Sequence, residues 1–138
     1  MRDSMKIDWK PWGHEEIMID PTIYPDAPYI MKRLVIKAGE LLSEQYHKEK
    51  DESYYVESGT CEITLKKPTT NESKTAILSP DDTVHILPGT IHRLRAITET
   101  RVLEVSTPHL GDIVRISDKY GRVPLIALKE KADTVQPA

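Results

Sequence analysis

Ten prolines and six glycines interrupt the 138-residue chain at short intervals. The segments between these residues are only about 5 to 10 residues long, which is the usual length of a β-strand. Amphipathic runs long enough for a helix are scarce. This spacing predicts an all-β domain, in which short strands joined by tight turns form a sandwich or a barrel.

Apolar and β-branched residues between these breaks indicate where the strands lie. We expect strands at residues 30–37, 53–59, 60–67, 75–79, 83–88, 91–98 and 101–107. The polar run 68-PTTNES-73 predicts a hairpin loop. Residues 8–20 combine Pro, Gly and two Trp, so we expect their first part to be irregular or an edge strand on the barrel.

Length and charge restrict the class of protein. One domain is expected over residues 1–127, with residues 128–138 as a flexible tail because they contain few apolar groups. The formal net charge of −3 provides no broad positive field for nucleic acid. Cys61 has no second cysteine to pair with, and no window approaches the about 20 apolar residues of a membrane span. These features predict a soluble, cytoplasmic protein with neither nucleic acid nor membrane as partner.

The stretch 45-QYHKEKDE-52 contains several residues that can bind a metal ion. Gln45 and His47 are two apart and project from the same face if they lie on a strand. Glu52 follows a charged turn, and His92 comes directly after the turn 88-PGT-90. Together they offer nitrogen and oxygen ligands suited to Zn, Mn, Fe, Ni or Co. Spacing alone leaves open the alternative, that they form only the polar end of an ordinary strand.

The run from Gly39 to Gly59 resembles the first signature of the cupin superfamily, with Gln45 where many members have His. The run 87-LPGTIHRL-94 resembles the second signature, although the position of Pro88 and the presence of Ala96 depart from the usual pattern. The resemblance implies a single-domain cupin, a double-stranded β-helix or jelly-roll barrel. It also implies that one divalent metal ion is bound by Gln45, His47, Glu52 and His92.

A more specific resemblance covers residues 10–122. The ordered pieces are 10-KPWGHEE-16, 39-GELLSEQYH-47, 58-SGT-60, 89-GTIHRL-94 and 112-DIVRISDKYGR-122, and they resemble the cupin domain of type II mannose-6-phosphate isomerases. In bacteria that domain is commonly fused behind a nucleotidyltransferase, whose Gly-rich opening is absent here. The resemblance implies an aldose–ketose isomerase that acts on a sugar or sugar phosphate through a metal-stabilised enediol.

Isomerisation also needs an acid or base, and three residues are candidates. Lys50 lies in a Lys-x-Glu pattern that resembles the type I phosphomannose isomerase site, but 48-KEKD-51 also has the composition of a solvated turn. Glu104 lies among apolar strand neighbours, where an unpaired carboxylate would be costly, so it either faces the cavity or pairs at an edge. His85 alternates with its apolar neighbours and either faces the cavity or is a hydrogen-bonded barrel histidine.

Other residues are candidates for binding the substrate. Lys32, Arg33 and Arg122 match basic positions of the family, and such cations either hold a sugar phosphate or form ion pairs with acidic residues such as Asp112 and Asp118. Tyr54 has the same strand parity as Glu52 and is expected to line the cavity. Trp12 either stacks on the sugar or closes the barrel.

Two other functions remain open at this stage. The first is a carbohydrate-binding or sensing cupin without catalysis, and the second is a dioxygenase-type cupin that uses Fe or Mn. Small barrels often associate through edge strands, so a homodimer is expected.

Overall fold

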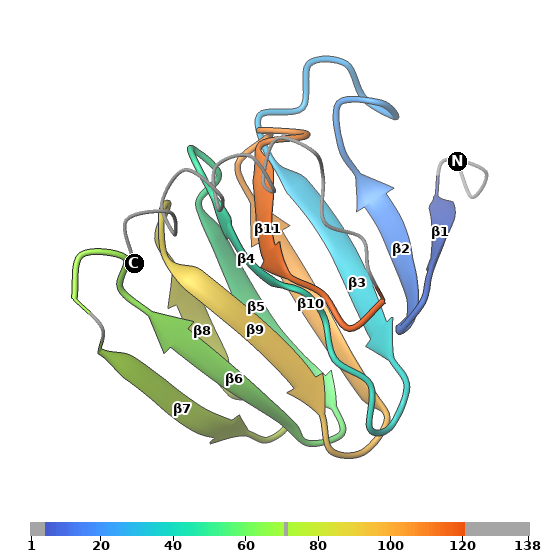
Figure 1. The fold of residues 1–138 in the computed structure, drawn as a ribbon. Helices are drawn as coiled ribbons and strands as arrows, with labels where there is room; N and C mark the ends of the chain where they lie inside the picture. The colour runs from blue at the N-terminus through green and yellow to red at the C-terminus, as the bar shows by residue number, and fades with distance from the viewer. Residues whose placement is uncertain (1–4, 71, 121–138) are drawn as a thin grey trace.

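The computed structural model describes residues 5–70 and 72–120, which form strands, turns and loops without a helix (Figure 1). The strands are β1 (Lys6–Lys10), β2 (Gly13–Ile19), β3 (Ile30–Ile36), β4 (Glu44–His47), β5 (Glu52–Ser58), β6 (Cys61–Lys66), β7 (Ser73–Leu78), β8 (Thr83–Ile86), β9 (Ile91–Ala96), β10 (Thr100–Ser106) and β11 (Ile113–Ser117). Arg122 and the predicted tail lie outside the described residues. In the described part, no helix has the length and apolarity to span a membrane.

The strands form two antiparallel sheets that face each other (Figure 1). One sheet has the order β1-β2-β3-β10-β5-β8, and the other has the order β11-β4-β9-β6-β7. Strands that are distant in sequence, such as β3 and β10, are neighbours, so most contacts that define the interior are long-range. The prediction of an all-β jelly-roll barrel is confirmed.

Most predicted strands agree with the structure to within two residues at each end. Residues 8–20 form most of a hairpin in which β1 is the sheet edge and β2 is an interior strand, so the expected edge strand in their first part is confirmed. The strand β11 was not predicted from the sequence. It has five residues and pairs with the four-residue β4, so its formation depends on a tertiary partner more than on its own pattern.

The turn after β5 shows why a glycine is needed there. Gly59 has φ +82°, a conformation that L side chains rarely adopt. A Cβ at this position would also lie 2.1 Å from the carbonyl oxygen of Glu99. The backbone of the neighbouring turn therefore approaches so closely that both conformation and space exclude a side chain.

The barrel interior changes from apolar to polar along its length. On the six-stranded sheet, Val102 pairs with Val56 and Leu34, and two residues further along β10 Glu104 pairs with Tyr54 and Lys32. We call the two halves of the interior the apolar end and the polar end. The apolar end comprises Leu34, Ile36, Val56, Cys61, Ile63, Leu94, Ala96 and Val102. The polar end comprises Lys32, His47, Lys50, Glu52, His92, Glu104 and Ser106.

Candidate functional site

Three buried side chains with metal-binding capacity converge at the polar end. His47 at the end of β4, Glu52 at the start of β5 and His92 on β9 place one potential ligand atom each within 4.8 Å of one another. The Glu52 Oε2 atom lies 2.7 Å from His47 Nε2 and 4.0 Å from His92 Nε2. The sequence predicted these three residues as ligands, and the fold brings them together.

The hydrogen bonding of this cluster is incomplete. Both carboxylate oxygens of Glu52 and the Nε2 atom of His92 are buried without a well-aligned hydrogen bond from any described residue. Buried polar atoms without partners are rare because leaving them unsatisfied costs roughly 1–3 kcal/mol each. A divalent cation would satisfy these atoms at once, since imidazole nitrogen and carboxylate oxygen are ordinary ligands of Zn, Mn and Fe. The donor set therefore fits a metal ion.

The electrostatics keep the cluster in the form that binds a cation. Burial opposes ionisation of Glu52, but His47, His92 and Lys50 outweigh it and lower the pKa of the carboxyl. Burial lowers the pKa of His92 even though Glu52 acts in the opposite direction. Near neutral pH the two shifts favour a carboxylate at Glu52 and a neutral imidazole at His92, which are the ligating forms.

Gln45 is placed beside this cluster by strand pairing. It is the register partner of His92 between β4 and β9, so the two side chains project from the same face. Its Oε1 atom accepts a hydrogen bond from Ser43 Oγ at 2.5 Å and keeps a second lone pair. The N–H of Gly89 donates to the His47 carbonyl at 2.7 Å and holds the turn before His92 against β4.

Asp112 supports His47 from the loop before β11. Its Oδ1 atom lies 3.1 Å from His47 Nδ1, while its Oδ2 atom accepts the backbone N–H groups of Glu49 and Lys50 at 2.8 Å each. Burial raises the pKa of Asp112, but these donors outweigh it and lower the pKa overall. With Nδ1–H donating to Asp112, His47 Nε2 faces Glu52 as an acceptor, and two acceptors 2.7 Å apart need a proton or a cation between them.

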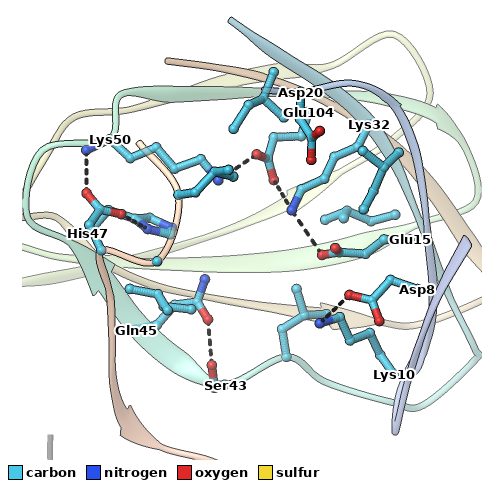
Figure 2. Close-up of a pocket in the computed structure, with 18 of the residues that line it drawn as sticks. Asp8, Lys10, Glu15, Asp20, Lys32, Ser43, Gln45, His47, Lys50 and Glu104 are labelled. Atoms are coloured by element: carbon cyan, nitrogen blue, oxygen red, sulfur yellow. Dashed lines mark hydrogen bonds and ion pairs between the residues drawn. The ribbon is translucent and has the colours of Figure 1, made fainter. Parts of the chain in front are cut away.

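A row of alternating charges continues from the cluster (Figure 2). Lys50 Nζ lies 2.9 Å from Glu104 Oε2, Lys32 Nζ lies 3.8 Å from Glu104 Oε1, and Lys32 Nζ also donates to Glu15 at 3.2 Å. Ser106 Oγ donates to Glu104 at 2.9 Å. Only 7% of Lys50 and 3% of Glu104 is exposed, so Lys50 does not belong to a solvated turn and Glu104 faces the interior.

The charged row and His47 of the cluster border a cavity of about 340 Å³. Its walls include Gln45, His47 and Lys50, and also Glu104 with the neighbouring Lys32 and Glu15 (Figure 2).

Two predicted aromatic residues also lie at the cavity. Tyr54 is buried, and its ring meets that of His92 edge-on with centroids 6.4 Å apart. Burial, followed by the charges of Glu52 and Glu104, raises the pKa of the Tyr54 phenol. Trp12 lines the cavity and also belongs to the hydrophobic core, so it closes the barrel and forms part of the cavity wall.

The fold does not bring two of the predicted residues to this site. The side chain of His85 is 57% exposed on β8 and pairs with Asp51 at 2.6 Å, because the apolar neighbour Ile86 occupies the interior face. Arg33 lies on the opposite face of β3 from Lys32 and binds Glu57 and Glu16 at 2.6 and 2.7 Å.

Sequence reasoning did not select Asp112 or Glu15 for this site. Both are within matched pieces of the sequence, 112-DIVR-115 and 10-KPWGHEE-16. Their place in those pieces is the signal that could have identified them.

Comparison with known proteins identifies the family of the chain. Residues 2–118 match the family model described as "Mannose-6-phosphate isomerase C-terminal". The chain belongs to this family. Members that it resembles include a mannose-1-phosphate guanylyltransferase of Salmonella montevideo, at 35% identity over 83% of the chain and 23% of that protein. The alginate biosynthesis protein AlgA of Pseudomonas aeruginosa is 29% identical over 88% of the chain and 24% of its own length. The chain thus spans about a quarter of the length of these relatives.

Solved structures of cupins share the fold of this family member. Oxalate decarboxylase from Bacillus subtilis superposes with a TM-score of 0.74 at 16% identity, covering 96% of this chain and 37% of that one. KdgF from Halomonas sp. superposes with a TM-score of 0.63 at 20% identity, covering 81% of this chain and 94% of that one. At these identities the similarity demonstrates the cupin fold alone.

Proposed function

We propose that this chain is a metal-dependent cupin that isomerises a sugar or sugar phosphate between its aldose and ketose forms. The observation that carries the proposal is the convergence of His47, Glu52 and His92, with buried atoms lacking hydrogen bonds, beside the buried pair of Lys50 and Glu104. The family match and the sugar-nucleotide enzymes among the relatives support a sugar substrate. A cytoplasmic location remains our prediction.

One divalent ion, Zn, Mn, Fe, Ni or Co, would be held by His47, Glu52 and His92, and Gln45 would be the fourth ligand. When bound, such an ion supplies Lewis-acid stabilisation of the negative charge that develops on substrate oxygens. The chain's own part is to keep His92 and Glu52 in their ligating forms and to bury them away from water.

Lys50 and Glu104 supply the proton transfer. Lys50 is ion-paired as an ammonium, so it acts as a proton donor and as a positive charge beside the reacting oxygens. The Glu104 carboxylate is the base that removes the proton from the carbon next to the carbonyl and returns it to the neighbouring carbon. Ser106 Oγ and Lys32 orient this carboxylate, which Figure 2 shows between the two lysines.

Lys32 and Tyr54 bind the substrate on the cavity wall. Lys32 keeps its charge because Glu104 and Glu15 raise its pKa, although burial acts in the opposite direction. A substrate phosphate would displace Glu15 from Lys32, whereas a neutral sugar would leave that pair in place. Arg122 remains a candidate from the sequence alone.

The mutual neutralisation of Lys50 and Glu104 favours one other function. A carboxylate that is fully engaged by Lys50, Lys32 and Ser106 is also what a binding site without catalysis would contain. In that case the chain is a carbohydrate-binding or sensing cupin, and the metal ion and lysines hold the ligand without moving a proton.

Proton exchange distinguishes these functions. The metal-loaded protein is incubated in deuterated water with a panel of aldose and ketose phosphates, and NMR follows exchange at the carbon next to the carbonyl. We expect exchange in the wild type, and loss of exchange with retained metal in Glu104→Gln. His85→Ala is the matched control, since His85 lies outside the cavity. If the fully loaded wild type exchanges no sugar of the panel, the enzyme proposal fails in favour of the binding function.

A further inference from the structure

The edge strand β1 has an inverted distribution of polar and apolar residues. One face of β1 contains every second residue, namely Lys6, Asp8 and Lys10. Of these, Asp8 and Lys10 line the cavity described above. The opposite face, directed to solvent, contains Ile7 and Trp9, which are 50% and 75% exposed, and Met5 directly before the strand is 46% exposed. A strand of a monomeric barrel usually has the opposite arrangement, with apolar residues inward and polar residues outward. The inversion indicates that this outer face is covered by another surface.

The free backbone groups of β1 belong to the same residues. β1 and β2 form a hairpin with a two-residue loop, in which Lys10 pairs with Gly13. Such a loop closes on a hydrogen-bonded pair, so Lys6, Asp8 and Lys10 direct their backbone groups to β2. Ile7 and Trp9 direct theirs to the open edge of the sheet. β1 lies at the edge of the sheet (Figure 1). This edge therefore offers a ladder of backbone groups together with a row of apolar side chains.

The other edge of the same sheet differs. β8 exposes Thr83 and His85, and His85 is engaged by Asp51. Polar and charged side chains at an edge oppose pairing with another sheet. Of the two edges of this sheet, β1 is thus the one suited to receive a further strand.

We propose that β1 pairs antiparallel with β1 of a second copy of the chain, about a two-fold axis at Ile7. In this register Ile7 lies opposite Ile7 of the second copy, and Met5 lies opposite Trp9 of the second copy. Ile7 and Trp9, whose backbone groups point to the open edge, then belong to hydrogen-bonded pairs, and the apolar side chains of Met5, Ile7 and Trp9 cover one another.

The charges on the other face favour this register. It places Lys6 of each copy opposite Asp8 of the other, which forms two opposite-charge pairs. A two-fold axis one residue earlier would place Lys6 opposite Lys6, and one residue later would place Asp8 opposite Asp8. Like charges directly across a ladder are destabilising, so Ile7 is the centre that the sequence of β1 supports.

An engineered disulfide tests both the surface and the register. The Cα atoms of a hydrogen-bonded antiparallel pair are about 5.5 Å apart, within the range of a disulfide. Under mild oxidation we expect Ile7→Cys in the full chain to form a covalent dimer on a non-reducing gel. Trp9→Cys is the matched control, because its two introduced thiols would lie roughly 13 Å apart along the ladder. The native Cys61 is fully buried and does not compete.

Exchanging the two charges gives a second test that needs no oxidation. Lys6→Glu is expected to weaken the dimer about 2- to 30-fold in sedimentation equilibrium, and Lys6→Glu combined with Asp8→Lys is expected to restore it. Lys74→Glu on the exposed edge strand β7 is the control that leaves the dissociation constant unchanged.

A wild type that sediments as a monomer at about 100 μM would overturn the proposal. Cross-linking of Asp8→Cys in place of Ile7→Cys would overturn the register, and a dimer in which neither cross-links would place the interface elsewhere.

Discussion

The apolar and polar ends of the barrel interior are built by the same strands. β3, β5, β9 and β10 each contribute inward-facing residues to both ends, and a step of two residues along β3, β9 or β10 leads from one end to the other. At the apolar end these residues pack without specific partners, so their contribution depends on buried area and shape. At the polar end each buried charge needs a partner, so its contribution depends on geometry. The same strands therefore contribute apolar packing at one end of the interior and paired buried charges at the other.

The largest effect is expected from breaking the charge row at the polar end. Glu104→Ala leaves Lys50 buried without its 2.9 Å partner, and removing one member of a buried pair typically costs about 3–5 kcal/mol. Urea unfolding measures this loss. The double variant with Lys50→Met and Glu104→Met is expected to recover most of it, because no charge is left uncompensated. A loss below about 1 kcal/mol in Glu104→Ala would mean that water replaces the partner.

At the apolar end, truncation should cost stability without affecting metal binding. Leu34→Ala removes a fully buried side chain and is expected to lower the free energy of unfolding by about 2–5 kcal/mol. Ile77→Ala, at a position 53% exposed on β7, is the control and should change it by about 0.5 kcal/mol or less. Metal affinity unchanged in Leu34→Ala would confirm that the two ends are separate, and a strong decrease would contradict it.

Metal binding should make the polar end contribute to stability as well. A divalent ion at about 100 times its dissociation constant is expected to raise the free energy of unfolding by about 2.7 kcal/mol. Thermal or urea unfolding with and without a chelator measures this difference. His92→Ala removes one of the three converging ligands and should abolish most of it. Equal stability of the wild type with metal and with chelator would refute the site.

The smallest effect is expected at Asp112, which is not a candidate ligand itself and contacts the three-residue cluster through His47. Asp112→Asn presents an amide to Nδ1 and disfavours the tautomer that leaves Nε2 free, so metal affinity should fall about 10- to 100-fold. Competition titration measures the affinity, and ¹⁵N NMR of the metal-free protein reports the tautomer of His47 directly. Asp51→Asn is the control, since Asp51 contacts the exposed His85. A loss of affinity without a change of tautomer would assign Asp112 to holding the turn at Glu49 and Lys50.

Much of this architecture was predictable from the sequence, because strand length and alternation are local properties. The alternation of Val84, His85 and Ile86 correctly indicates that His85 faces away from Ile86. It does not indicate which of the two faces inward, and the hydrophobic core decides that by taking Ile86. The same reasoning applies to Lys32 and Arg33, since only one of two adjacent strand residues can reach the cavity.

Other features depend on contacts between distant segments. The local composition of 48-KEKD-51 is that of a solvated turn, yet Lys50 is buried because Glu104 of β10 lies beside it and Asp112 holds its backbone. The sequence by itself determined an all-β fold of short strands, because turn residues and alternation are local properties, and its resemblance to the cupin signatures implied the candidate ligands Gln45, His47, Glu52 and His92. Only the tertiary structure decided which charged residues are buried, because the desolvation cost of a charge is offset by partners that are distant in sequence.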